Sequence, residues 1–257
     1  MAEQKEKTLV IVPTYNERKN ITTVINSVFG LNIPNLDLLV VDDNSPDGTA
    51  DEVRELMETN NRIFMIEREG KQGLGTAYIA GFHFAIENNY DYVFEMDADL
   101  SHDPKEIPNF LKAIEDADLV IGSRYIKGVN VINWPLRRLV LSLMASKYTK
   151  FITGMPVQDC TSGFKCFRRI VLETIPLDQV SSSGYSFQIE MNFKTWKRGF
   201  RIKEISIIFH DRTVCSRKTL EWFLILKSRL WNWKRKFWKW KNMPGKPVSI
   251  FRKILRG

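Results

Sequence analysis

The segment Tyr90–Asp99, Y-D-Y-V-F-E-M-D-A-D, carries the strongest indication of the fold. Its apolar and aromatic run is typical of a buried strand, and it ends directly in two carboxylates, Asp97 and Asp99. Residues two apart in an extended segment point the same way, so both side chains can face one ligand. Paired carboxylate oxygens suit Mg²⁺ or Mn²⁺ bridging a diphosphate, although acidic pairs after strands also occur in ordinary loops.

Short apolar runs of the same kind recur along the chain and end in polar residues. We expect strands at Thr8–Val12, Leu36–Val41, Arg62–Ile66, Leu119–Ile121 and Ile202–Phe209. Between the early runs, apolar residues repeat at helical spacing, and Trp134–Ile152 is predicted to form a helix with Pro135 in its first turn. Alternating strands and helices predict an α/β fold with a mainly parallel sheet, in which ligands bind beyond the carboxyl ends of the strands.

Composition and charge divide the chain unequally. The 257 residues are 44% hydrophobic, and three cysteines are too few for a disulfide framework. No window resembles a signal peptide or a spanning helix. Residues 212–257 hold 14 Lys or Arg and one acid, a net charge of +13, whereas residues 1–211 hold 24 Lys or Arg and 29 acids, a net charge of −5. A basic segment of this kind favours anionic lipid or nucleic acid.

Seven motifs occur in consistent order and together identify a family. They are V-P-T-Y-N-E at 12–17, V-D-D-N-S-P-D-G-T at 41–49, G-L-G-T-A-Y at 73–78, M-D-A-D-L-S-H at 96–102, G-S-R-Y at 122–125, D-C-T-S-G-F-K at 159–165 and G-Y-S-F-Q-I-E-M at 184–191. The chain resembles the polyprenol (dolichol) phosphate mannose synthases, which are inverting family-2 glycosyltransferases with the glycosyltransferase A fold. The resemblance covers roughly residues 8–218.

The resemblance implies a role for each matching residue of the donor site. The nucleoside would be cradled by Pro13, Tyr15, Glu17, Val40 and Asp42. Asp97 and Ala98 would border the diphosphate, and Asp99 would be the main metal ligand. Arg124 would contact the sugar or the phosphates, and a loop that closes over the donor would supply Arg212 and Lys218. The implied catalytic set is Asp97, Asp99, Arg124 and Arg212.

Two positions depart from the family pattern. Some relatives have a glutamine ligand two residues after the second aspartate, where this chain has Ser101, so Ser101, His102 or water would complete the metal coordination. The closing loop has Cys215 and Arg217 at the positions of the expected glycine and serine. Loss of the glycine removes backbone freedom, which puts the role of Lys218 in doubt.

An acceptor site can be argued from the predicted helix itself. Arg138 and Ser142 are four residues apart and share one helical face, where a guanidinium and a hydroxyl can hold a phosphate together with Arg124. The alternative is an ordinary surface helix with basic ends. A phosphate monoester, with a second pKa of about 6, is largely a dianion at neutral pH and needs no general base. We therefore expect direct attack on the anomeric carbon with inversion.

The C-terminal segment combines basic and aromatic residues. Its apolar residues recur at helical spacing: Leu226, Leu230, Trp233, Phe237 and Trp240. Tryptophan beside lysine and arginine is typical of a helix lying in a membrane interface. The same stripe could instead pack on the catalytic body or bind single-stranded nucleic acid. We assign residues 1–211 to the catalytic domain and 212–257 to a membrane-associating segment.

The sequence thus predicts transfer of mannose from GDP-mannose to polyprenyl (dolichyl) phosphate by a peripheral enzyme on the cytoplasmic membrane face, with Mg²⁺ or Mn²⁺. The product would be polyprenyl-phosphate β-mannose, and no nucleic-acid partner is expected. UDP-glucose or another donor is an alternative, and a separate membrane subunit is left open. A soluble or protein acceptor, with Asp159 or Glu190 as base, is a further alternative. A nucleotide-sugar or nucleic-acid binding protein without transfer activity is the rival from another class.

Overall fold

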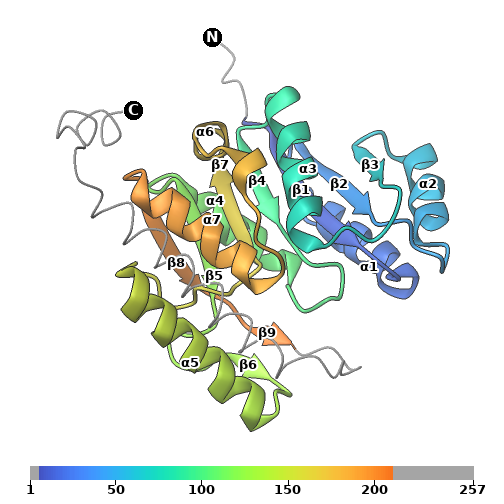
Figure 1. Ribbon diagram of the computed structural model, residues 1–257. Helices are drawn as coiled ribbons and strands as arrows, with labels where there is room; N and C mark the ends of the chain where they lie inside the picture. The colour runs from blue at the N-terminus through green and yellow to red at the C-terminus, as the bar shows by residue number, and fades with distance from the viewer. Residues whose placement is uncertain (1–5, 211–257) are drawn as a thin grey trace. The chain divides into compact units, whose positions relative to one another are not determined.

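The structure is a computed structural model that describes residues 6–210 (Figure 1). The main sheet of this part of the chain has the strand order β3-β2-β1-β4-β7-β5-β8. Its strands are β1 Thr8–Thr14, β2 Leu36–Asp42, β3 Ile63–Glu67, β4 Tyr92–Glu95, β5 Leu119–Ser123, β7 Lys165–Arg168 and β8 Ile202–Ser206. A second sheet pairs β6 Val131–Ile132 with β9 Phe209–His210.

The helices alternate with the strands through the first half of the chain, as predicted. They are α1 Arg18–Phe29, α2 Thr49–Thr59, α3 Leu74–Glu87, α4 Ile107–Ile114, α5 Leu136–Thr153, α6 Arg169–Thr174 and α7 Tyr185–Lys197, with short 3₁₀ turns at Pro104–Glu106 and Leu177–Gln179. No helix within residues 6–210 is both long and apolar enough to cross a membrane.

The strand predicted at Ile202–Phe209 is divided in the structure. β8 runs beside β5, and the N–H of Ile207 still donates to the carbonyl of Ser123 at 3.1 Å. β5 ends at Ser123, so β5 itself offers no partner to a longer β8 strand beyond that residue. The chain then leaves the main sheet, and Phe209 pairs with Val131 in the second sheet.

One strand runs against the rest of the sheet. β7 is antiparallel to both of its neighbours, β4 and β5, whereas all other pairs in the main sheet are parallel. The carboxyl ends of β1, β2, β4 and β5 therefore meet at one edge of the sheet, and the amino end of β7 lies there as well. Loops that are far apart in the sequence converge at this edge.

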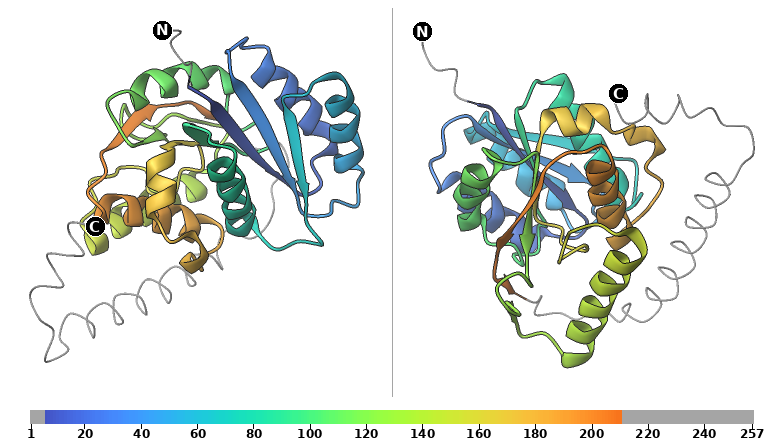
Figure 2. Two further views of the ribbon diagram at one scale, coloured as in Figure 1. Left: turned by 90° about the horizontal axis from the view of Figure 1, so that it is seen from above. Right: turned by 90° about the vertical axis from the view of Figure 1, so that its left-hand side faces the viewer.

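Helices cover both faces of the sheet (Figure 2). α1, α2 and α4 pack on one face, where Val10 and Val12 of β1 join a buried cluster with Ile21 of α1 and Phe110 of α4. α3, α6 and α7 lie on the other face, where Phe82 of α3 contacts rings of β7 and α7. Alternate residues of a strand point to opposite faces, which is why the buried strands are apolar at nearly every position.

Gly81 permits the close packing of α3 on β1, and replacing it with alanine is expected to destabilise the fold. A Cβ at this position would lie 2.7 Å from two carbons of Ile11. We expect the free energy of unfolding to fall by about 1–2 kcal/mol, because overpacking outweighs the helix propensity gained from alanine. Urea unfolding measures the change. Gly70→Ala is the control, since nothing lies within 4 Å of its added Cβ. Equal stability of the two variants would contradict this packing.

Candidate active site

The two carboxylates predicted after β4 lie in a short loop that its own hydrogen bonds hold in place. Oδ1 of Asp99 accepts the N–H of Ser101 at 3.0 Å and also the hydroxyl of Ser101. Leu100, between them, has a φ of 63°, a left-handed conformation that is uncommon for a residue other than glycine. Strained backbone of this kind clusters at functional sites. The turn fixes the direction of the Asp99 carboxylate, and Ser101 is buried as its hydrogen-bond donor.

Asp97 contacts His102 of its own loop and residues of two other segments. Its Oδ1 accepts the hydroxyl of Tyr78 at 3.3 Å, and its N–H donates to Nδ1 of His102 at 3.1 Å. Nε2 of His102 lies 4.0 Å from Oδ2 of the same carboxylate. Burial, together with the negative charge of Asp97, raises the pKa of the Tyr78 phenol well above its ordinary value, so Tyr78 stays a donor. A Cβ on Gly163 would lie 3.5 Å from Oδ2 of Asp97, so the loop before β7 packs against this carboxylate.

A buried ion pair supports the same edge of the sheet from within. Glu95 and Lys165 are register partners on β4 and β7, and Nζ of Lys165 lies 3.7 Å from Oε2 of Glu95. Nζ of Lys165 also donates to the backbone and side-chain oxygens of Gln188 on α7. Burial raises the pKa of Glu95 to about 7 although Lys165 opposes the change. Burial likewise lowers the pKa of Lys165. The pair ties α7 and β7 to the strand that leads to Asp97.

The residues predicted to cradle the nucleoside lie at the ends of β1 and β2. Thr14 and Asp42 are register partners, and the Asp42 carboxylate is fully buried. It accepts the hydroxyl of Thr14 at 2.6 Å, and the hydroxyl and N–H of Ser45 at 2.6 and 2.8 Å. Asp42 therefore shapes the loop, and its contact with a nucleoside stays a prediction. Of the other predicted residues, Tyr15 is exposed, Pro13 and Glu17 are half-buried, and Val40 is buried.

Asp43, next to Asp42, accepts hydrogen bonds from a loop to which the sequence analysis assigned no role. Oδ1 of Asp43 accepts Nε of Arg68 at 2.6 Å, and Oδ2 accepts the N–H of Gln72 at 3.2 Å. Nη1 of Arg68 also donates to the hydroxyl of Thr76 on α3 at 2.7 Å. The segment between β3 and α3 is thereby held beside the ends of β1 and β2. In this segment, Nζ of Lys71 lies 3.8 Å from the centre of the Tyr15 ring.

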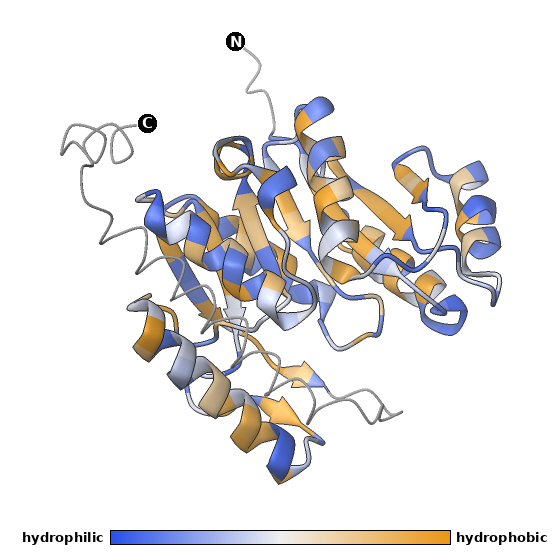
Figure 3. Ribbon diagram, viewed as in Figure 1, coloured by the Kyte–Doolittle hydropathy of each residue, from blue (hydrophilic) through white to orange (hydrophobic). Residues whose placement is uncertain are grey.

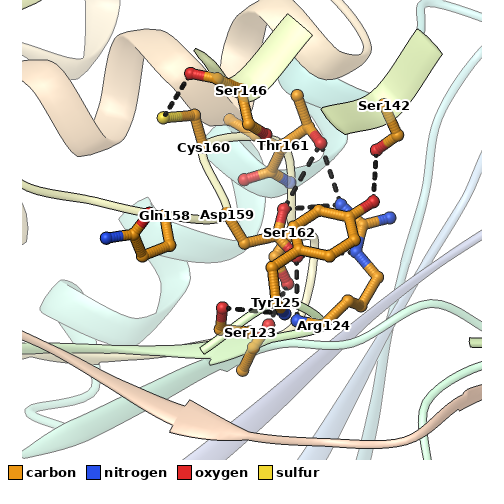
Figure 4. Close-up of polar contacts among 12 residues, drawn as sticks. Ser123, Arg124, Tyr125, Ser142, Ser146, Gln158, Asp159, Cys160, Thr161 and Ser162 are labelled. Carbon is orange, nitrogen blue, oxygen red and sulfur yellow. Dashed lines mark hydrogen bonds and ion pairs between the residues drawn. The ribbon is translucent and has the colours of Figure 1, made fainter. Parts of the chain in front are cut away.

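Arg124, at the end of β5, forms a buried bidentate pair with Asp159 (Figure 4). Nε and Nη2 of Arg124 donate to the two carboxylate oxygens of Asp159, each at 2.6 Å, and Nη2 also donates to Thr161 at 2.8 Å. Burial lowers the pKa of the Arg124 guanidinium, but the Asp159 carboxylate outweighs this effect and raises the pKa above its ordinary value. Asp159 thus serves as the counter-ion of Arg124.

The structure brings the three predicted acceptor residues to one place. Cζ of Arg138 lies 4.3 Å from the centre of the Trp134 ring, and Cζ of Arg124 lies 5.2 Å from the same ring. Ser142 accepts the hydroxyl of Tyr125 at 2.7 Å (Figure 4). Trp134 and Tyr125 were not predicted to contribute. Their positions in the sequence could have pointed to this site, because Tyr125 follows Arg124 and Trp134 begins the segment predicted as a helix.

The remaining predictions fall outside the described residues. Arg212, Lys218, the altered closing loop and the apolar stripe of the C-terminal segment all lie beyond residue 210. The boundary between 211 and 212 lies there too, so the predicted division into domains stays a prediction. Within residues 6–210, no three His, Cys, Asp or Glu side chains form a group that could by itself hold a metal ion.

Comparison of the sequence with known proteins assigns the family. The profile of glycosyl transferase family 2 matches residues 9–176. A polyprenol monophosphomannose synthase of Mycolicibacterium smegmatis is 45% identical over 209 residues, which cover 80% of this chain and 78% of that protein. An undecaprenyl-phosphate mannosyltransferase of Micrococcus luteus is 41% identical over 206 residues, which cover 80% of this chain and 84% of that protein.

Solved structures share the fold at low sequence identity. Glucosyl-3-phosphoglycerate synthase from Mycobacterium tuberculosis, in complex with Mn²⁺, UDP-glucose and phosphoglyceric acid, has a TM-score of 0.64 at 20% identity, covering 88% of this chain and 77% of that one. A mannosyltransferase from Pyrobaculum calidifontis with GDP-mannose and Mn²⁺ has a TM-score of 0.57 at 21% identity, covering 97% and 68%. The predicted glycosyltransferase A fold is confirmed, and the chain is a glycosyltransferase that belongs to family 2.

Proposed function

We propose that this glycosyltransferase transfers mannose from GDP-mannose to polyprenyl phosphate with inversion, giving polyprenyl-phosphate β-mannose. One observation carries the proposal. The loop after β4, which holds Asp97 and Asp99, lies at the same edge of the sheet as Arg124, which follows β5 and shares the Trp134 ring with Arg138. The first suits a metal-bound diphosphate, and the second suits a phosphate acceptor. The names of the two relatives at 45% and 41% identity support mannose and a polyprenyl phosphate as substrates.

The donor side has side chains that fit Mg²⁺ or Mn²⁺. Asp97 and Asp99 supply hard carboxylate oxygens, the ligands that these cations prefer. We assign Asp99 as the main ligand and Ser101 as the residue beside it that orients the carboxylate. When bound, the metal would neutralise charge on the leaving nucleotide diphosphate. Neighbouring structures of the same fold contain Mn²⁺ with a nucleotide or nucleotide sugar, which supports this assignment.

The acceptor side has side chains that fit a phosphate monoester. Arg138 and Ser142 lie one turn apart on α5, and Arg124 reaches the same ring, Trp134, as Arg138. A phosphate oxygen would form the new bond to the anomeric carbon while the bond to the diphosphate breaks. The phosphate dianion needs no general base. This agrees with the position of Asp159, the carboxylate considered as a base, because both of its oxygens accept hydrogen bonds from Arg124.

The α5 helix supports a membrane location for the acceptor. Its exposed residues include Leu136, Val140, Met144 and Phe151, and their spacing places them on one side of the helix. Its two buried residues, Ser146 and Thr149, are polar, so much of the apolar surface of this helix is not covered by the rest of the described protein. Figure 3 shows orange apolar segments along this helix. An exposed apolar stripe beside lysine and arginine fits the boundary of a lipid bilayer. We therefore propose peripheral association with the cytoplasmic membrane face, which the segment 212–257 would strengthen.

The proposal is tested by transfer of radiolabelled sugar into polyprenyl phosphate in the presence of Mg²⁺ or Mn²⁺. Organic-soluble label from GDP-mannose is expected, and the anomeric configuration of the product reports inversion. Label only from UDP-glucose would keep the lipid-phosphate acceptor and replace the donor. Absence of lipid label with every donor, despite tight nucleotide binding, would refute the proposed acceptor.

Arg138→Ala is expected to impair use of the acceptor far more than binding of the donor. The guanidinium groups of Arg138 and Arg124 both lie against the Trp134 ring, in the proposed acceptor site. We expect the KM for polyprenyl phosphate to rise about 10-fold or more, since a hydrogen bond to a charged group is lost, with little change in the KM for GDP-mannose. Lys147→Ala is the control, because Lys147 is exposed and lies on α5 away from its first turn. Equal losses for both substrates would contradict the assignment.

A further inference from the structure

We infer that Trp134 completes the acceptor-phosphate site: its indole holds the guanidinium groups of Arg124 and Arg138, and its Nε1 N–H donates to the phosphate. The inference rests on the proposed function for the identity of the phosphate, a polyprenyl monophosphate. It adds to that function a binding residue that neither the sequence motifs nor the family resemblance assigns.

The first observation is that two positive charges share one ring. The guanidinium carbons of Arg138 and Arg124 lie 4.3 and 5.2 Å from the centre of the Trp134 ring. Both distances fall within the range of about 6 Å at which a cation is attracted to an indole. The two guanidinium groups repel each other, so the ring that attracts both helps to keep them close enough to serve one anion.

The second observation is an unpaired donor at the same place. Nε1 of Trp134 is buried and has no hydrogen-bond partner in the described part of the chain. The indole N–H can only donate, so only an acceptor can satisfy it. A buried donor without a partner is destabilising, and in native proteins such groups are usually satisfied by a ligand, an ion or water. An acceptor brought by the substrate would satisfy this N–H.

The third observation is the positive character of the surroundings. The first turn of α5 has no acidic residue and contains both Arg137 and Arg138. The amino end of a helix already carries partial positive charge, so the two arginines stabilise this turn only if an anion is present. Arg124 donates to its negative partner, Asp159, through Nε and Nη2. Its Nη1 makes no hydrogen bond within the described residues and can therefore donate to a bound anion.

The fourth observation is the enclosure of the ring. Phe209 of β9 meets Trp134 edge-on, with the ring centres 5.4 Å apart and the planes at 80°. The rings of Phe209 and Tyr125 also lie 5.5 and 5.3 Å from Cζ of Arg124. Arg124 is only 4% exposed and Nε1 of Trp134 is buried. A buried environment has a low dielectric constant, which strengthens both the cation–indole attraction and a hydrogen bond from Nε1 to a dianion. An isoprenoid alcohol lacks the charge that this arrangement recognises, so the site selects the phosphate.

The inference is tested by NMR of the full chain labelled with ¹⁵N in its indole groups, titrated with geranyl phosphate or with geraniol. Trp134→Phe, which keeps the ring and removes the donor, identifies the signal of Trp134. Trp134→Tyr identifies the same signal independently if the first variant folds poorly. Trp196→Phe is the matched control, since Trp196 also has a lysine 4.3 Å from its ring centre but lies on α7.

We expect the Trp134 N–H signal to shift with geranyl phosphate but not with geraniol. The Kd for geranyl phosphate should weaken about 10-fold in Trp134→Phe and stay unchanged in Trp196→Phe, because a hydrogen bond to a charged group is lost only in the first. An unmoved Trp134 signal, or wild-type affinity in Trp134→Phe, would overturn the inference. A shifted signal in a protein that transfers no sugar would uphold Trp134 and refute the proposed function instead.

Discussion

Replacing Asp99 with alanine is expected to lower sugar transfer by about 10³-fold while the protein remains folded. The Asp99 carboxylate is oriented by two donors from Ser101 and lies two residues after Asp97 in the loop that follows β4. Its loss would remove the main proposed metal ligand and with it the stabilisation of charge on the leaving diphosphate. Radiolabel incorporated into polyprenyl phosphate, measured across a range of Mn²⁺ concentrations, reports the effect.

Asp116→Ala provides a matched control for this loss. Asp116 is a highly exposed aspartate, and its contact with Lys203, at 3.7 Å, lies on the surface. Its removal should leave transfer unchanged. Near-wild-type transfer by Asp99→Ala would show that other groups stabilise the leaving diphosphate, and the assigned metal site would then be wrong. Rescue of Asp99→Ala by high Mn²⁺ would indicate weakened metal affinity and would support the assignment.

Replacing Asp159 with asparagine is expected to lower the free energy of unfolding by about 3–5 kcal/mol, because removing one member of a buried ion pair leaves an uncompensated charge. Asp159 is fully buried, and Arg124 is only 4% exposed. Both carboxylate oxygens accept from Arg124, so the amide of asparagine cannot replace either the charge or both acceptors. Urea unfolding followed by circular dichroism measures the loss.

An exposed ion pair shows what the same kind of change does at the surface. Glu52 accepts Nε of Arg18 at 2.9 Å, and the arginine side chain is 58% exposed. Glu52→Gln should change the free energy of unfolding by less than about 1 kcal/mol, since water solvates the remaining charge. If Asp159→Asn were no more destabilising than Glu52→Gln, the Arg124–Asp159 pair would not be buried as described.

The sequence determined the local elements and the chemistry at the ends of the parallel strands. The strands β1, β2, β3, β4 and β5 were predicted because the apolar or alternating pattern of a strand can be recognised within a few consecutive residues. Asp97 and Asp99 were placed beyond β4 because two carboxylates directly follow an apolar run. The helix α5 was predicted because its pattern is equally local, and its observed bounds, Leu136–Thr153, differ by at most two residues from the prediction.

Only the tertiary structure decided how separate loops combine. β7 is short and was not predicted. By entering the sheet antiparallel between β4 and β5, it brings Asp159, in the loop before it, to the edge where Arg124 follows β5. These two residues are 35 positions apart, and Trp134, which contacts Arg124, lies between them in the sequence. Such contacts depend on strand order and on burial of the whole sheet. A pattern that extends over ten residues therefore predicts a helix or strand, but not which distant segments of the chain will contact it.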